Sequence, residues 1–340
     1  MPELWYALLA LMLTAYAVLD GFDFGAGILH LFVARNESER REVFAAIGPF
    51  WDGNEVWLIG AGGVMFLAFP VLLATAFPAF YLSLFVVLWC LLLRGIAIEL
   101  RSHVNNAEWR TFWDAVFALS SALLALLFGV ALGNVVRGLP LDAEEVTTLP
   151  LFTDFGVSGR VGLIDWYTLL VGVFSVGLLT SHGALFLQYR SRSDLTTRAH
   201  RVERALRWPL LGLFIGVSVA THLVRPDFFV ALATRPLAWF ALGIGLVGGV
   251  LASREAGQGG RRFVGSCLRI SGLLGALAVA VFPTLLRSTL DPAHSLTLGQ
   301  AMSGDYSRRV ALFWWPLAFV LAVAYLALAF WTHRAPVTRE

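Results

Sequence analysis

The sequence contains no lysine, few charges of either sign and only two cysteines. All 25 basic residues are arginine, and charged residues make up 14% of the 340 positions, against roughly 25% in an ordinary soluble domain. This composition excludes a typical soluble globular fold, and we expect no nucleic-acid partner. Cys90 and Cys267 both fall in apolar segments, so we expect free thiols and neither a disulfide framework nor a Cys-ligated metal.

Motifs for nucleotide or zinc chemistry are missing as well. The sequence has no phosphate-cradling glycine loop, no Cys-x-x-Cys pair and no His-Glu-x-x-His motif. We therefore predict no metal site, and nothing in the sequence supports nucleotide-driven chemistry.

Long apolar runs are abundant, since 58% of the residues are hydrophobic. Windows of about 20 apolar residues predict an all-α polytopic membrane protein with nine spans. The predicted spans are 4–33, 43–69, 77–100, 109–136, 164–188, 206–225, 236–253, 263–286 and 310–332. We predict a single transmembrane domain over 1–340, with a first four-helix bundle at 1–136, a second at 164–286 and a last helix at 310–332.

The distribution of arginine predicts the orientation of these spans. If the N-terminus lies outside, 18 arginines fall on inner loops and the C-terminal tail and seven fall on the outer side. Cytoplasmic loops carry an excess of basic residues. We therefore expect the N-terminus outside and the C-terminus in the cytoplasm.

Acidic residues interrupt the first two apolar segments. Asp20 and Asp23 are three residues apart and hence on one helix face, with Gly21 and Gly25 beside them allowing close helix approach. Ionisable groups inside a membrane are costly and mark functional sites. Either these carboxylates form a buried proton or cation site, or they hydrogen-bond neighbouring helices in a packing seam.

The second acidic pair lies in the segment Trp51-Asp52-Gly53-Asn54-Glu55-Val56-Trp57. Asp52 and Glu55 again share a face, and we place both in the inner half of the membrane. Trp51 and Trp57 flank them, and Trp57 lies too deep for an interfacial belt residue. The alternative is that Gly48-Pro49 followed by Asp52 starts a helix, but Glu55 continues the polarity one turn further.

The third span ends in a further polar group. Glu99 and His103 are four residues apart near the inner surface, and an imidazole beside a carboxylate suits proton collection. Arg94 lies deeper and is expected to pair with a buried acid, for which Asp114 at the start of the fourth span is a candidate. Interfacial snorkelling explains Arg101 and Arg110 better. We expect the acidic and basic groups of spans one to four to form one hydrated network.

Spans five to nine contain little comparable chemistry. His182 and His222 are the histidines well within them, and either could in principle ligate haem. Neither has a partner at a sensible depth, so we interpret them as hydrogen-bonded core residues.

Several ordered blocks of the sequence resemble subunit II of the cytochrome bd quinol oxidases, the bacterial terminal oxidases. The blocks are DGFDFG at 20–25, ERR at 39–41, IGPFWDGNEVWL at 47–58, RGIAIELRS at 94–102, EWRTFWD at 108–114, GVALGNVVRGLP at 129–140, HGALFLQYR at 182–190 and HSLTLGQAMS at 294–303. The resemblance implies a nine-helix subunit of the bacterial cytoplasmic membrane. It also implies a complex that oxidises quinol and reduces dioxygen to water.

The same resemblance implies partners and cofactors. The chain would pair with a homologous subunit I, which carries two haems b and one haem d, and sometimes with a small single-span subunit. Lipid and quinone would surround it, and some members bind a structural quinone in subunit II. No haem contacts are expected in this chain.

Residue roles follow from the resemblance only where the motifs match. Asp52 matches an aspartate on a proton route from the cytoplasm, and Glu99 and His103 match the polar positions that lead to it. Asp23, Arg94 and Asp114 match positions linked to subunit integrity and to the neighbouring haem. We therefore expect Asp52, Glu99 and His103 to form a proton pathway, and expect a surrounding charge network of Asp20, Asp23, Glu55, Arg94, Asp114, Trp51 and Trp57.

Two other functions remain open on the sequence. A scaffold subunit would only stabilise its haem-bearing partner. An ion-coupled secondary transporter would also carry intramembrane acids and glycine-rich helices, although its sites lie near the midplane rather than in the inner half.

Overall fold

The computed structural model of the chain is almost entirely helical, and it describes residues 1–142, 148–254 and 259–337. The long helices are α1 (Pro2–Val33), α3 (Trp51–Ala68), α5 (Tyr81–Leu100), α6 (Ala107–Arg137), α7 (Trp166–Arg190), α8 (Asp194–Val224), α10 (Pro236–Ser253), α11 (Gly259–Val281) and α13 (Asp305–Thr332). Shorter helices are α2 (Glu37–Ile47), α4 (Pro70–Ala79), α9 (Pro226–Thr234) and α12 (Leu298–Ala301), with a 3-10 turn at Pro292–His294. β1 (Thr284–Leu286) pairs antiparallel with β2 (Leu296–Thr297).

Eight of these helices are long and apolar enough to cross a membrane. Among the long helices α3 does not qualify, because the polar residues of its first turn lower its hydropathy. Six predicted spans (the first, fourth to seventh and ninth) correspond to single helices, with α8 starting earlier, at Asp194. The count of nine spans and the predicted orientation remain predictions.

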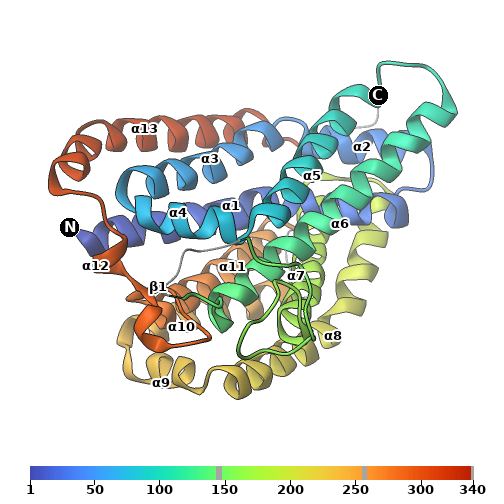
Figure 1. The fold of residues 1–340 in the computed structure, drawn as a ribbon. Coiled ribbons are helices and arrows are strands. Elements are labelled where there is room, and N and C mark those ends of the chain that lie inside the picture. The colour runs from blue at the N-terminus through green and yellow to red at the C-terminus, as the bar shows by residue number, and fades with distance from the viewer. Residues whose placement is uncertain (143–147, 255–258, 338–340) are drawn as a thin grey trace.

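Helix α1 forms the centre of the molecule and packs against α3, α6, α7 and α11. In Figure 1, α13, α3 and α1 lie side by side, whereas α8, α9 and α10 form the opposite edge. Because α1 contacts helices of both predicted four-helix bundles, the two share one interior. Their division into separate bundles stays a prediction.

Glycines permit the closest contact of α1. A Cβ on Gly25 would lie 2.0 Å from the carbonyl oxygen of Leu179, and a Cβ on Gly183 would lie 2.3 Å from the carbonyl carbon of Gly25. The backbones of α1 and α7 therefore touch at a Gly–Gly crossing. This confirms the predicted role of the glycines near the first acidic pair.

The second and third predicted spans are broken. Residues 48–50, which include Gly48 and Pro49, form a turn that separates α2 from α3, so 43–69 is not one helix. The third span, predicted over 77–100, is divided at Phe80 between α4 and α5, and α4 begins at Pro70 in a segment predicted as a loop. Proline fits the first turn of a helix, where its missing N–H has no partner to lose.

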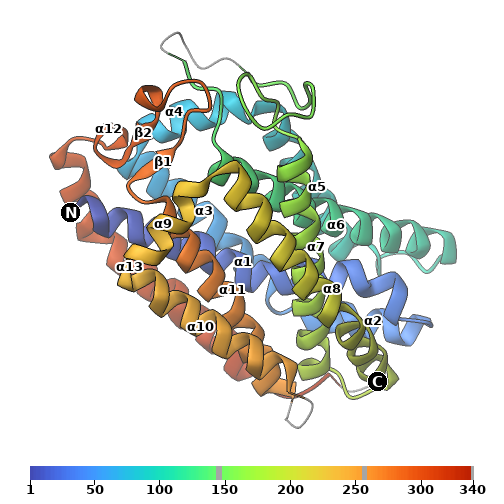
Figure 2. The same ribbon diagram turned by 90° about the horizontal axis from the view of Figure 1, so that it is seen from below.

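The eighth predicted span ends early. Helix α11 finishes at Val281, and the residues that follow form β1. The segment that follows α6 pairs with the segment that follows β1, because the backbone N–H of Leu139 donates to the Arg287 carbonyl and the Leu139 carbonyl accepts from Thr289. As Figure 2 shows, β1, β2 and α12 lie at the end of the molecule where α1 begins.

The opposite end of the molecule holds α2 and is called the α2 end below. Helices α1, α5 and α7 end there, and helices α6 and α8 begin there.

Candidate functional site

The buried ionisable residues of the first half of the chain, drawn from α1, α2, α3, α6 and the C-terminal part of α5, form two separate clusters rather than one network. The first, called the Arg94 cluster, comprises Arg94 with its partners Asp20 and Glu55, and the pair Asp23–Asn54, whose carboxyl group interacts electrostatically with Asp20, Glu55 and Arg94. The second, called the Asp114 cluster, lies at the α2 end and comprises His30, Glu37, Arg40, Arg101 and Asp114. No hydrogen bond or ion pair between described residues joins the two.

Arg94 is fully buried and binds two carboxylates. Its Nη1 and Nη2 donate to the two oxygens of Asp20, the second at 3.1 Å, and Nη2 also donates to Glu55 at 2.5 Å. The prediction that Arg94 pairs with a buried acid is confirmed, but its partners are Asp20 and Glu55 rather than Asp114. The Asp20 side chain is fully buried, whereas 27% of the Glu55 side chain is exposed.

Asp23 has a neutral partner. The amide nitrogen of Asn54 donates to Asp23 Oδ2 at 2.8 Å and to the carbonyl oxygen of Leu19 at 3.1 Å. Both side chains are completely buried. Asp23 therefore lies in the same cluster as Arg94 but without a hydrogen bond to a cation among the described residues.

The tryptophans on either side of Asp52 pack differently. Trp57 is buried and meets Phe319 of α13 edge to face, with ring centroids 5.8 Å apart. Trp57 therefore packs between α3 and α13, and its depth in the membrane stays a prediction. Trp51 lies against α5, where a Cβ on Gly95 would be 3.3 Å from its ring.

The three predicted proton-pathway residues are exposed on the chain taken alone. Asp52 lies in the first turn of α3, Glu99 in the last turn of α5, and His103 just beyond it. The His103 ring bonds the backbone carbonyl of Glu99 at 2.8 Å and not its carboxylate. The prediction that the His103 imidazole contacts the Glu99 carboxylate is therefore wrong, although both side chains lie at the α2 end.

Asp114 accepts hydrogen bonds from three basic residues at the α2 end. It is fully buried and accepts from Arg101 at 2.5 Å, from Arg40 at 2.8 Å and from the ring of His30 at 2.7 Å. Arg101 is 1% exposed and also reaches Glu37 at 2.9 Å. Arg101 is thus a buried structural residue and not the snorkelling interfacial residue that we predicted.

Glu37 forms the outer edge of this cluster. Burial by itself would raise the pKa of its carboxyl group, but hydrogen bonds from Arg101 and Arg41 hold that pKa below its usual range. The side chain is 37% exposed, so the cluster reaches the surface here.

Sequence reasoning missed His30 and underrated Asn54 and Arg101. His30 lies seven residues after Asp23 and hence on the same face of α1, which is a signal that could have been used. Asn54 lies inside the acidic motif of α3, but its role depends on Asp23 of α1, which accepts its hydrogen bond. The pairing of Arg101 with Glu37 joins residues far apart in the sequence and had no local signal.

The two histidines predicted to lie within the later spans, His182 and His222, have different surroundings. Both ring nitrogens of His182 are occupied, by the Val18 carbonyl oxygen at 2.8 Å and by the Ser266 hydroxyl at 2.7 Å. This confirms the interpretation of His182 as a hydrogen-bonded core residue. His222 is exposed near the end of α8. The prediction that it is a core residue is therefore wrong. Within the described ranges no group of three or more His, Cys, Asp or Glu could hold a metal ion.

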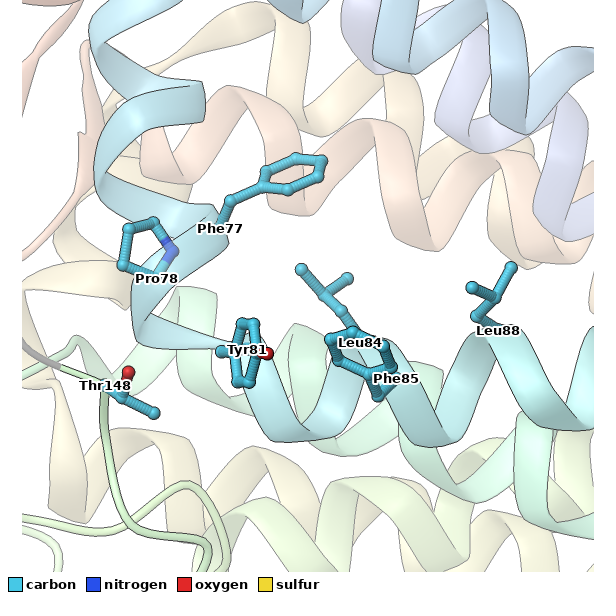
Figure 3. A pocket seen from close by; sticks show the side chains of 7 residues that line it. All are labelled: Phe77, Pro78, Tyr81, Leu84, Phe85, Leu88 and Thr148. Carbon is cyan, nitrogen blue, oxygen red and sulfur yellow. The ribbon is translucent and has the colours of Figure 1, made fainter.

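A pocket of about 440 Å³ lies apart from these clusters, where α4 meets α5 (Figure 3). Its lining is apolar except for Tyr81 and Thr148. The lining residues are Phe77, Pro78, Tyr81, Leu84, Phe85, Leu88 and Thr148. It holds no ionisable carboxyl or basic group and takes no part in the arrangement of acids described above.

Comparison with known proteins decides the family. The model of cytochrome bd terminal oxidase subunit II matches residues 1–333. The chain belongs to the cytochrome bd terminal oxidase subunit II family. It is therefore a multi-pass protein of the bacterial inner membrane and a subunit of an oxidoreductase.

Relatives within this family span nearly the whole chain. The cytochrome bd-I ubiquinol oxidase subunit 2 of Escherichia coli (strain K12) is 31% identical over 366 aligned positions, covering 99% of this chain and 95% of the relative. The cytochrome bd ubiquinol oxidase subunit 2 of Bacillus subtilis (strain 168) is 32% identical and covers 91% and 88%. The bd oxidase of Geobacillus thermodenitrificans has a similar fold, with a TM-score of 0.69 at 17% identity over 97% of this chain and 98% of that one.

Proposed function

We propose that the chain is the non-haem subunit of a bd-type quinol:dioxygen oxidoreductase and that it delivers cytoplasmic protons to a haem-bearing subunit I. Two haems b and one haem d are assigned to that partner. Some complexes of this kind include a small single-span subunit, and the surrounding membrane supplies lipid and quinone. Both ring nitrogens of His182 in this chain are hydrogen-bonded, so that histidine offers no free ligand for a haem.

The observation that carries the proposal is the contrast in exposure between neighbouring acids. Asp52 and Glu99 are exposed on α3 and α5, while Asp20 and Asp114 are buried and held by arginine. A residue that passes a proton to another subunit must reach that subunit, and carboxylates held by guanidinium groups are poor carriers. The exposed residues are therefore the ones suited to transfer.

The surface around them supports a protein contact. Few residues of α5 are buried within the chain, and Leu84, Leu88, Trp89 and Leu92 are exposed on it. In our proposal His103 and Glu99 collect protons, and Asp52 hands them across the interface with subunit I. Asp20, Glu55, Arg94 and Asp114 hold the helices and balance charge.

Asp52→Asn tests this role in the purified complete complex. We expect slower oxygen consumption with unchanged haem content, since the amide cannot carry a proton. Asp194→Asn is a matched control, because Asp194 is also an exposed acid in the first turn of its helix and contributes the same favourable interaction with the helix N-terminus. Wild-type turnover in Asp52→Asn would overturn the assignment.

The same experiment separates the scaffold function. The observation favouring a scaffold is that Asp52 lies in the first turn of α3, where any acid stabilises a helix. A purely structural Asp52 predicts loss of haem together with activity, or no effect at all.

A further inference from the structure

The Arg94 cluster contains more acids than cations. Asp20, Asp23 and Glu55 supply three carboxyl groups, and Arg94 is the guanidinium that faces them. Arg94 uses both terminal nitrogens on Asp20 and Glu55. Glu55 is partly exposed and can be solvated, but Asp23 is 0% exposed. An ionised Asp23 would be a buried charge without a hydrogen bond to a cation among the described residues, which is strongly unfavourable.

Two oxygen atoms in this cluster have no hydrogen-bond partner among the described residues. They are Oδ1 of Asp23 and Oδ1 of Asn54, and both are buried. These residues are already joined by the bond from the Asn54 amide to Asp23 Oδ2. A carboxylate and an amide oxygen are both acceptors, so neither can satisfy the other without an additional proton.

Exchanging the oxygen and nitrogen of Asn54 does not resolve this. The amide nitrogen in its present position donates to two acceptors, Leu19 O and Asp23 Oδ2. After the exchange an amide oxygen would face both of them. The amide orientation is therefore fixed by the Leu19 carbonyl, which can only accept.

We propose that Asp23 is a neutral carboxylic acid that stores a proton, with its O–H donating to the amide oxygen of Asn54. The acid and the amide then form two parallel hydrogen bonds, one in each direction. One proton satisfies both unpartnered oxygens and removes one negative charge from the cluster.

This inference rests on the proposed function for its place in catalysis, but the protonation of Asp23 does not depend on it. Asn54 and Glu55 share the first two turns of α3 with Asp52. When Asp23 gives up its proton toward Asp52, it becomes a carboxylate and Asn54 loses one bond. A proton from the α2 end restores the acid.

Charged and titratable groups on each neighbouring helix set this equilibrium. Asp20 and Tyr16 are on α1, Asp52 and Glu55 on α3, and Arg94 on α5. On α7, His182 faces α1 near Gly21. Negative groups outnumber positive ones around Asp23, which favours the protonated form.

Infrared difference spectroscopy of the complete purified complex tests the proposal. We expect a protonated-carboxyl carbonyl band that shifts in D2O, is lost in Asp23→Asn, and remains in Asp52→Asn. In Asn54→Leu the band should move to higher frequency, because the acid loses its acceptor. Identical carboxyl bands in wild type, Asp23→Asn and Asn54→Leu would overturn the proposal.

A matched pair of variants provides a second readout that does not need the band. Asparagine resembles a neutral acid, so Asp23→Asn should keep the thermal midpoint of the complex close to wild type. Asp20→Asn removes the ionised partner of Arg94 and should lower the midpoint clearly. Equal losses in the two variants would overturn the proposal. If the protonated-carboxyl band is missing but Asp52→Asn slows oxygen consumption, only the storage of a proton on Asp23 is refuted. If the band is present but Asp52→Asn consumes oxygen at the wild-type rate, only the delivery of protons by Asp52 is refuted.

Discussion

Removing Arg94 should expose how much the fold depends on a single buried guanidinium. In Arg94→Gln, Asp20 loses both terminal nitrogens that it binds, and Glu55 loses its 2.5 Å contact. Breaking a buried pair by removing one partner costs about 3–5 kcal/mol, because the remaining charge is left without compensation. With an unfolding entropy of about 2.1 cal/mol/K per residue, a chain of 340 residues shifts by about 1.4 °C per kcal/mol, so the thermal midpoint should fall by at least about 4 °C.

The assay is the thermal unfolding midpoint of the purified complex, followed together with its haem absorption. Arg41→Gln is the control. Arg41 also pairs with a glutamate, Glu37, but its side chain is 60% exposed, and surface pairs contribute only about 0–1 kcal/mol. Its midpoint should stay within about 2 °C of wild type.

A double variant identifies the mechanism. Asp20→Asn combined with Arg94→Gln leaves two neutral amides that can hydrogen-bond each other, and Glu55 can turn to water. The double variant should therefore be more stable than Arg94→Gln alone. If Arg94→Gln is no less stable than Arg41→Gln, or if the double variant is the least stable of all, the reasoning about the buried pair is refuted.

Two further predictions concern the helix crossing and the α2 end. Gly25→Ala should sharply lower the yield of assembled complex, because its Cβ would collide with the Leu179 carbonyl, whereas Gly62→Ala, with nothing within 4 Å, should assemble normally in the same expression assay. The lowered pKa of Glu37 means that its ion pairs add stability above the usual glutamate pKa, and this stability is lost as the pH falls through the lowered value. Lowering the pH from 7 to 4 should thus reduce the thermal midpoint more in wild type than in Glu37→Gln, and equal reductions would contradict the role of Glu37.

Much of the helical fold follows from hydropathy alone. The boundaries expected for the first, fourth, fifth and seventh spans fall within about two residues of α1, α6, α7 and α10. The breaks at 48–50 and at Phe80 were harder to place, because the flanking residues stay apolar. Pro49 lies in the first break and Pro78 two residues before the second, but a proline can kink a span as well as end it. The three-residue strand β1 depends on its partner β2 and has no periodicity of its own.

The candidate site was predictable in its composition but not in its pairing. Intramembrane acids identified Asp20, Asp23, Asp52 and Glu55 directly, since each is costly in hydrocarbon. The assignment of Arg94 to Asp20, and of Arg101 to Asp114, depends on how α5 and α6 are placed around α1. That placement follows from side-chain packing over the whole bundle, so the separation into two clusters could not be read from the order of the residues.

The charge balance of the two clusters explains why they are separate. At the α2 end, Glu37 and Asp114 face Arg40, Arg41, Arg101 and Arg110. Arginines outnumber carboxylates among these six residues, and their ion pairs, with the bond from His30 of α1 to Asp114, tie α1, α2, the end of α5 and α6 together. Around Arg94 the acids exceed the cations, so a proton must be shared among them or supplied from outside. We infer that the chain divides anchoring from proton handling along successive turns of α1, with His30 in the first role and Asp23 in the second.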